Sequence, residues 1–206
     1  MTALDIIYNS KMVNEPLFIE DFVNENVKYD SAKTMLSNWA RAGILMRYAQ
    51  GVYYIPKKTP LGNSTISFES VIERKYIADK NQVFGYYSGM TLLNSVGLTT
   101  QVPNIPEITT NKEATRKRKV TIGKRSVIVR KSEIEISEEN AVYLQFLDIF
   151  RYADIDSITK SKEKIIAFFD RNRLSFNSLQ QIEKEVAAKL RKALRRSGIY
   201  DELAYR

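Results

Sequence analysis

Hydrophobic positions recur with a helical period near the start of this 206-residue chain. Between residues 31 and 43 they follow the 3-1-3-4 spacing of a single buried helix face, at Ala32, Met35, Leu36, Trp39 and Gly43. This spacing predicts a helix over residues 31–42. Asp30 is a good N-cap for the helix, and Gly43 supplies the left-handed residue that commonly ends one.

Three further elements surround this helix in the N-terminal sequence. Residues 2–9 are typical of a short helix, and Pro16 suits the first turn of a second helix that runs through Phe18, Phe22 and Val23. Residues 44–48 and 52–55 read as two strands around a turn, in which Gly51 supplies a positive φ. The predicted order is three helices and then a hairpin, which is the order of a winged helix-turn-helix domain.

The remainder of the chain follows a polar segment that is typical of a linker. Residues 56–65 hold two prolines, one glycine and a single large apolar residue, Leu61. We therefore divide the chain into a winged-helix DNA-binding domain (1–57), a linker (58–66) and a C-terminal domain (67–206). Spacing in the last part predicts helices over 68–78, 89–96, about 140–152, 160–172 and 177–197, with strands at 83–87 and within 105–136. The expected fold class is α+β, with a winged helix-turn-helix domain followed by a mixed α/β domain that ends in helices.

The polar face of the predicted 31–42 helix carries side chains that suit a DNA groove. Residues 31–55, which span this helix and the hairpin, contain no Asp or Glu. Hydroxyls and amides can reach base edges in the major groove, while Lys and Arg bind guanine edges or phosphates. An arginine at the hairpin tip can enter the minor groove or contact a phosphate. The candidate DNA-binding residues are Lys28, Ser31, Lys33, Thr34, Ser37, Asn38, Arg41, Arg47, Tyr48 and Gln50.

The net charge of +8 is unevenly distributed along the chain. Residues 112–131 hold nine basic side chains and one acidic one, whereas residues 132–156 hold one basic and seven acidic ones. The basic block indicates a polyanionic partner, and its candidate phosphate or partner contacts are Arg116, Lys117, Arg118, Lys119, Lys124 and Arg125. An exposed hairpin at the edge of a sheet, whose charges prevent pairing with another strand, explains the block about as well. Residues 1–60 carry only +1, so we expect a homodimer to double the contacts with DNA.

The absence of cysteine and histidine removes most catalytic classes. Disulfides, zinc fingers, thiol nucleophiles and histidine-dependent triads are all excluded. Magnesium held by carboxylates stays open, but no DxD or strand-end ExK element accompanies the acids Glu133, Glu135, Glu138 and Glu139. We therefore expect a protein that is not an enzyme and uses no cofactor or metal. No apolar stretch approaches about 18 residues and the start does not resemble a signal peptide, so we expect a cytoplasmic protein without a membrane partner.

Two segments resemble the AbiEi family of antitoxins, the antitoxin-repressors of type IV toxin–antitoxin systems. Residues 39–57, WARAGILMRYAQGVYYIPK, resemble the winged-helix end of that family, and residues 85–111 resemble the start of its C-terminal domain. The most specific match is the run Gly-Leu-Thr-Thr-Gln-Val-Pro at residues 97–103. The resemblance implies a winged helix that binds inverted repeats in the promoter of its own operon. It also implies an antitoxin domain that counters a nucleotidyltransferase-like toxin in abortive infection, and it carries over no catalytic residues.

Two alternative functions stay open from the sequence. The first is a magnesium-dependent nucleic-acid enzyme that a winged helix delivers to its substrate. The second is a protein–protein interaction module, whose winged helix binds protein instead of DNA. Taken alone, the 31–42 helix is also explained as an ordinary amphipathic helix with a soluble face. The sequence does not specify whether the toxin is contacted directly, what the operator sequence is, or what the last 50 residues do.

Overall fold

The computed structural model describes residues 12–80 and 82–205, which form two compact units. The first unit runs to Arg74 and includes Thr121–Arg125, and the second comprises Lys75–Val120 and the chain from Ser126 onward. Both contain helices and small sheets, so the α+β class is confirmed. The helix predicted at residues 2–9 lies outside the described residues.

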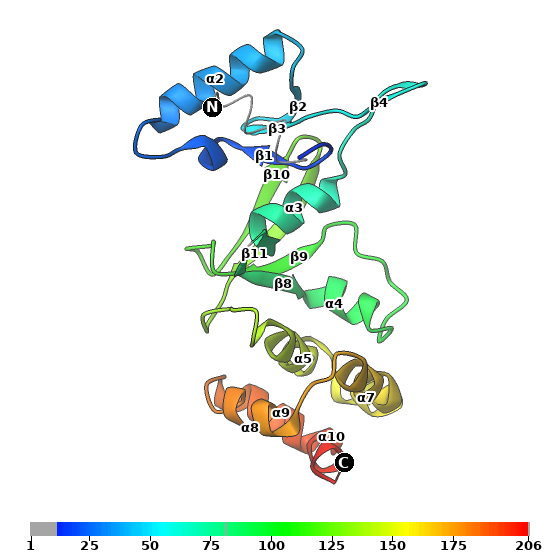
Figure 1. The fold of residues 1–206 in the computed structure, drawn as a ribbon. Helices are drawn as coiled ribbons and strands as arrows, with labels where there is room; N and C mark the ends of the chain where they lie inside the picture. Colours follow the sequence, from blue (N-terminus) through cyan, green and yellow to red (C-terminus); the bar gives the residue numbers. More distant parts are fainter. Residues whose placement is uncertain (1–11, 81, 206) are drawn as a thin grey trace. The chain divides into compact units, whose positions relative to one another are not determined.

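The first unit is built from a small sheet and one long helix (Figure 1). Strand β1 (Leu17–Phe18) leads into the 3-10 helix η1 (Ile19–Phe22), which is followed by helix α2 (Tyr29–Arg41) and the hairpin β2 (Met46–Ala49) and β3 (Val52–Tyr54). The strand order is β1-β3-β2, and β3 is antiparallel to both neighbours. The predicted strand pair around Gly51 is thus confirmed to within two residues.

The α-helix predicted from Pro16 is wrong. Leu17 and Phe18 instead pair with β3, where Leu17 is opposite Tyr53 and fully buried. Only the next four residues form a helix, and it is the 3-10 helix η1. At its start the Phe18 N–H donates a hydrogen bond to the Asp21 carboxylate at 2.7 Å. Pairing with a strand more than thirty residues away therefore outweighs the local helical pattern.

Helix α2 confirms the predicted apolar face but begins two residues earlier than expected. Lys28 is at the N-cap, so Asp30 is not the cap and lies in the first turn, where a carboxylate favours the helix dipole. Ala32 and Leu36 are fully buried in a core with Leu17, Leu45, Tyr53 and Ile55. The helix ends at Arg41, and Gly43 has the predicted positive φ of 72°.

The first unit is completed by three short segments. Residues 58–63, within the predicted linker, form a small hairpin of β4 (Lys58–Thr59) and β5 (Gly62–Asn63), and α3 (Phe68–Tyr76) follows. Arg74 of α3 contacts Asp21 at 3.0 Å and donates to the Pro16 carbonyl oxygen. The turn Thr121–Arg125 also belongs to this unit, and its Arg125 forms a 2.7 Å ion pair with Glu69.

The second unit contains a four-stranded mixed sheet with strand order β10-β11-β9-β8. Its strands are β8 (Gly85–Ser88), β9 (Glu107–Thr110), β10 (Lys117–Ile122) and β11 (Arg125–Lys131), and a separate hairpin is formed by β6 (Ala78–Asp79) and β7 (Gln82–Val83). Strand β9 is antiparallel to β8 and parallel to β11. Helix α4 (Gly89–Ser95) connects β8 to the loop before β9, and Gly97 ends it with a positive φ, as predicted.

A helical layer, two helices deep, packs against strand β8 of this sheet (Figure 1). It consists of α5 (Ala141–Tyr152), α6 (Ile155–Lys160), α7 (Lys162–Arg171), α8 (Phe176–Ile182), α9 (Ala188–Arg196) and α10 (Ile199–Ala204). Helix α5 lies between β8 and α9, and its Phe146 is fully buried with its ring 5.2 Å from that of Phe169. In the described part of the chain, no helix has the length and apolarity needed to cross a membrane.

The single helix predicted over residues 177–197 is wrong, because the chain breaks between α8 and α9. No glycine or proline marks the break in the sequence. Glu183 is buried there and forms a 2.6 Å ion pair with Arg195 of α9. The break places this ion pair inside the unit, a tertiary contact that helical periodicity does not reveal. Helix α10 was not predicted. Gly198, which has a positive φ, separates it from α9, and the chain resumes a helix directly after this glycine.

Candidate nucleic-acid interface

The exposed face of α2 carries most of the residues expected to contact DNA. Lys33, Thr34, Asn38 and Arg41 are exposed, and Ser37 is half-buried. The Arg41 guanidinium donates to Asn38 Oδ1 at 3.3 Å, which aligns two of these side chains along the face. In addition to these, Ser31 in the first turn and Lys28 at the N-cap are exposed. The structure thus brings the predicted helix residues together on one surface.

A shallow hollow of about 590 Å³ lies along this face. Asp30, Ser31, Thr34, Met35, Asn38 and Trp39 line it. Four of these side chains are polar, so they can donate to or accept from base edges. The carboxylate of Asp30 stands at one end of the hollow; it would repel a phosphate but can accept a hydrogen bond from cytosine N4.

The β2–β3 hairpin presents two polar side chains at its free end. Arg47 and Gln50 are exposed, and the turn depends on Gly51, whose φ is 74°. The pairing register shifts between Arg47 and Ala49, and the Arg47 Nε donates to the Ala49 carbonyl oxygen at 3.4 Å. Arg41 and Arg47 form no ion pair within the described part of the first unit. Their positive charges are therefore available to a polyanion.

Tyr48 has a different environment from its neighbours in the hairpin. It is half-buried, and a Cβ on Gly123 would lie 3.8 Å from its carbonyl oxygen and 4.0 Å from its ring. Burial raises the pKa of the Tyr48 phenol, although the nearby Arg125 guanidinium partly opposes this. Tyr48 therefore packs against the 121–125 turn, and it is the least accessible of the predicted hairpin contacts.

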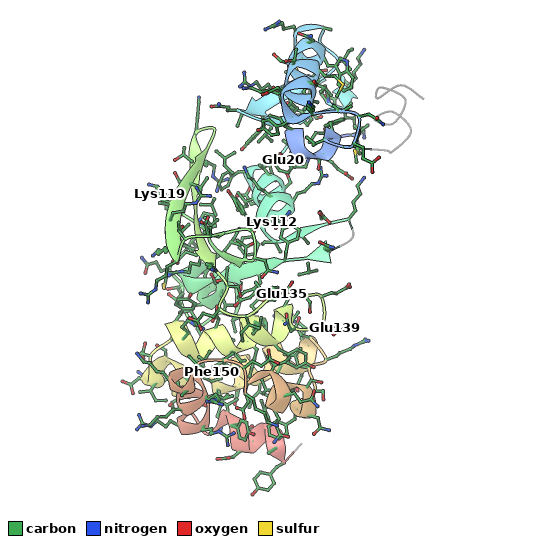
Figure 2. The ribbon with its side chains drawn as sticks, turned by 90° about the vertical axis from the view of Figure 1, so that its left-hand side faces the viewer. Glu20, Lys112, Lys119, Glu135, Glu139 and Phe150 are labelled. Carbon is green, nitrogen blue, oxygen red and sulfur yellow. The ribbon has the colours of Figure 1, made fainter. Side chains whose placement is uncertain are left out.

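The six basic residues expected as secondary contacts do not form one patch. Arg118 is bound to the buried Glu113 at 2.6 Å, and Arg125 is bound to Glu69 and lies 4.4 Å above the Phe68 ring. The other four, Arg116, Lys117, Lys119 and Lys124, are exposed. Strand β10 is at the edge of the sheet, and Figure 2 shows Lys119 on its outer side. This placement favours the interpretation of a charge-protected edge strand.

Glu113 anchors strand β10 through its ion pair with Arg118, and this contact leads to a testable prediction. Burial raises the pKa of its carboxyl, but hydrogen bonds from the Thr115 N–H (2.9 Å), the Thr115 hydroxyl (2.7 Å) and Arg118 outweigh burial and lower it. We expect Glu113→Gln to lower the free energy of unfolding by about 1–3 kcal/mol at pH 7. Because the folded-state pKa is lowered, the loss should shrink as the pH falls below the ordinary glutamate range.

Urea denaturation of both proteins between pH 3 and pH 7 measures this difference. The exposed Glu135, which precedes α5 (Figure 2), supplies the control Glu135→Gln, expected to change stability by less than about 0.5 kcal/mol. Equal effects of the two substitutions would contradict the assignment of Glu113 as a buried anchor.

The structure does not bring the four glutamates considered as a magnesium site together into one cluster. Both Glu133 oxygens accept hydrogen bonds from Arg151, at 2.9 and 3.2 Å, and this arginine lowers the Glu133 pKa. Glu135, Glu138 and Glu139 are exposed in the segment before α5, where Figure 2 labels Glu135 and Glu139. Across residues 12–80 and 82–205, no three acidic side chains gather into a group that could hold a metal ion.

Sequence reasoning missed the buried carboxyl of Asp148 in α5. Its Oδ2 accepts a hydrogen bond from the Tyr86 hydroxyl at 3.1 Å, and its Oδ1 lies 2.9 Å from Arg151 Nε. Burial raises the pKa of Asp148 to about 6. The signal in the sequence is a lone acid within the apolar run from Leu144 to Phe150, which indicates a charge that folding must place inside.

These elements define a two-unit α+β protein, one unit of which presents cationic and amide side chains on a helix and a hairpin. Residues 6–173 match a family of unknown function (DUF6088), and the chain belongs to this family. The match ends just after α7, so α8, α9 and α10 lie beyond it. No curated protein matches the chain.

Proposed function

We propose that this protein is a sequence-specific DNA-binding autorepressor whose first unit is a winged helix-turn-helix domain. Helix α2 lies in the major groove, and the β2–β3 hairpin contacts the adjacent minor groove or phosphates. The observation that carries the proposal is the exposed face of α2, where Lys33, Thr34, Asn38 and Arg41 lie together without a carboxylate beyond the first turn.

The order of elements supports this proposal. Strand β1, the short η1, α2 and the β2–β3 hairpin follow the winged-helix order, with η1 as the helix that precedes the recognition helix. The 13 residues of α2 extend over roughly 20 Å, which is enough to cross a major groove about 12 Å wide. The buried side of α2 is fixed on the core through Leu36, so its polar side is presented rigidly.

The resemblance to AbiEi antitoxins supports a second part of the proposal. We assign to the second unit the role of antitoxin against a nucleotidyltransferase-like toxin in a type IV system. The Gly-Leu-Thr-Thr-Gln-Val-Pro run is an ordered loop: Lys164 donates to the Gly97 carbonyl oxygen at 2.6 Å, and the Asn94 amide donates to that of Thr99 at 3.2 Å. Val102 in the same loop is 77% exposed, so the loop offers an apolar contact at the surface. The proposal includes no catalytic step.

A gel-shift assay with the promoter upstream of the protein's own gene tests DNA binding. We expect Arg41→Ala and Arg47→Ala each to weaken binding roughly tenfold, because each removes one base or phosphate contact. Affinity should fall steeply with salt, with a slope that is shallower by about 1 when a phosphate-binding cation is lost.

Arg171→Ala is the matched control, because Arg171 is the basic residue in the last turn of α7 just as Arg41 is in α2. This control removes the same charge from an exposed helix end of the second unit, and we expect no change in the shift. Equal weakening by Arg171→Ala would reveal a general charge effect. A wild-type protein without preference for that promoter over random DNA would refute the repressor proposal.

Co-expression with a nucleotidyltransferase-like reading frame beside the gene tests the antitoxin role. We expect growth arrest by that toxin to be relieved by the wild-type chain and equally by Arg41→Ala, whose substitution is in the DNA-binding unit. Growth arrest that persists with the wild-type chain would refute the antitoxin role and leave DNA binding untouched.

A further inference from the structure

The second unit contains a cavity of about 800 Å³ that the proposed function does not use. It lies between the sheet, the segment after β11, α5 and the start of α9. This volume is within the range of roughly 300–1,000 Å³ that is typical of small-molecule sites. All its lining residues belong to the second unit, so the cavity is formed by one compact body.

One wall of the cavity is apolar. Leu144, Leu147 and Phe150 of α5 line it together with Val186, which precedes α9, and Leu190 in the first turn of α9. All five side chains are at most 5% exposed, and Figure 2 shows Phe150 in the helical layer. Such a wall accommodates the hydrophobic or aromatic body of a ligand.

The polar side of the cavity carries more positive than negative charge. Five cationic side chains line it against two carboxyl groups, Glu133 and Asp148. Both carboxyl groups are bound to Arg151. Arg130 is held by Glu107, which lies outside the lining and accepts from Arg130 Nε at 3.1 Å and Nη2 at 2.7 Å. The paired arginines are therefore fixed in position.

Three lining cations, Arg116, Lys131 and Lys189, form no ion pair in the described part of the chain, although Arg116 lies close enough to Glu133 to help lower the pKa of that carboxyl. All three are exposed, so they mark the open side of the cavity. Three positive charges beside an apolar wall favour a ligand with a multiply charged anionic group at one end.

We propose that this cavity binds a small organic phosphate with an apolar or aromatic body, of the mononucleotide type. The phosphate lies between Arg116, Lys131 and Lys189, and the body lies against Leu147, Phe150 and Leu190. The inference is independent of DNA binding by the first unit, and its test uses no DNA.

Two kinds of probe separate the body of the ligand from its charge. The fluorescent anion 8-anilinonaphthalene-1-sulfonate reports on the cavity, and AMP, GMP, CMP and UMP compete with it. Adenosine supplies a body without charge, and inorganic phosphate supplies charge without a body. With the full-length chain we expect at least one mononucleotide to displace the dye, at least about tenfold more tightly than adenosine or phosphate alone.

Lys131→Ala and Lys189→Ala test the cationic side. Each should weaken binding of the displacing nucleotide roughly fivefold, as expected for the loss of one exposed charge beside an anion. Lys192→Ala is the matched control, because Lys192 is an exposed lysine on the same helix that does not line the cavity. Ala193→Phe tests the apolar side, since a larger side chain there fills the cavity and should abolish binding.

Several results would overturn the proposal. If no mononucleotide displaces the dye at about 1 mM, the phosphate assignment is wrong. If Lys189→Ala and Lys192→Ala have equal effects, the nucleotide binds outside the cavity. Circular dichroism of each variant identifies loss of fold, and the two surface lysine variants keep the test valid if Ala193→Phe does not fold.

Discussion

Gly85→Ala is expected to destabilise the second unit by about 3 kcal/mol or more. A Cβ at this position would collide with the Tyr76 carbonyl oxygen and lie 2.9 Å from that of Thr109. Both obstacles are backbone atoms: Thr109 belongs to β9, and Gly85 pairs with its neighbour Thr110. The Thr109 oxygen cannot move without disturbing the pairing of β8 with β9, and the Tyr76 oxygen lies at the end of α3; strand β8 also packs against α5. The measurement is urea denaturation followed by far-ultraviolet circular dichroism.

Gly43→Ala is the control for this prediction. A Cβ at Gly43 meets no atom within 4 Å, and the substitution costs only the strain of a positive φ of 72°, about 1 kcal/mol. A loss at Gly85 no larger than that at Gly43 would contradict the close backbone approach around β8.

Asp148→Asn is expected to remove the loss of stability that the wild type undergoes when Asp148 ionises with rising pH. Burial raises the pKa of Asp148 to about 6 against the opposing Arg151 and Tyr86, while Glu133 raises it and Arg130 lowers it to a smaller extent. Because the folded-state pKa lies above the ordinary aspartate value of 3.8, the stabilising contribution is complete below pH 4 and is lost as the pH rises through 6. The free energy of unfolding of the wild type, relative to Asp148→Asn, should fall by about 2–3 kcal/mol over this window.

Urea denaturation of the two proteins at several values between pH 4 and pH 8 measures this difference. Asp156→Asn is the control, because Asp156 is exposed in the first turn of α6; it should stay within about 0.5 kcal/mol of the wild type throughout. A wild type that gains stability relative to Asp148→Asn as the pH rises would show that the ion pair with Arg151 outweighs burial.

Local sequence patterns predicted the elements that are stabilised locally. The buried face of α2 could be predicted because Ala32 and Leu36 lie one helical turn apart. The β2–β3 turn could be predicted because Gly51 tolerates a positive φ. Strand β1 was missed because Leu17 is held by Tyr53, a partner distant in sequence. The break before α9 was missed because it depends on the contact between Glu183 and Arg195.

The same distinction applies to the candidate site. Exposure of Lys33, Asn38 and Arg41 followed from helical periodicity alone. The partner of Arg125 did not, because Glu69 lies 56 residues away in the chain. The cavity of the second unit could not be predicted, since its walls come from β-strands and helices that only the fold brings together. Charge counts locate basic segments, but only tertiary structure reveals which charges are already neutralised.

The turn Thr121–Arg125 has a consequence for dissecting the protein into fragments. The chain passes between the two units three times, after Arg74, Val120 and Arg125. A single cut therefore cannot release both units whole: a fragment that ends at residue 57 loses Glu69, and one that ends at residue 74 loses its partner Arg125. A cut within the turn would leave both halves of the chain joined only by noncovalent contacts.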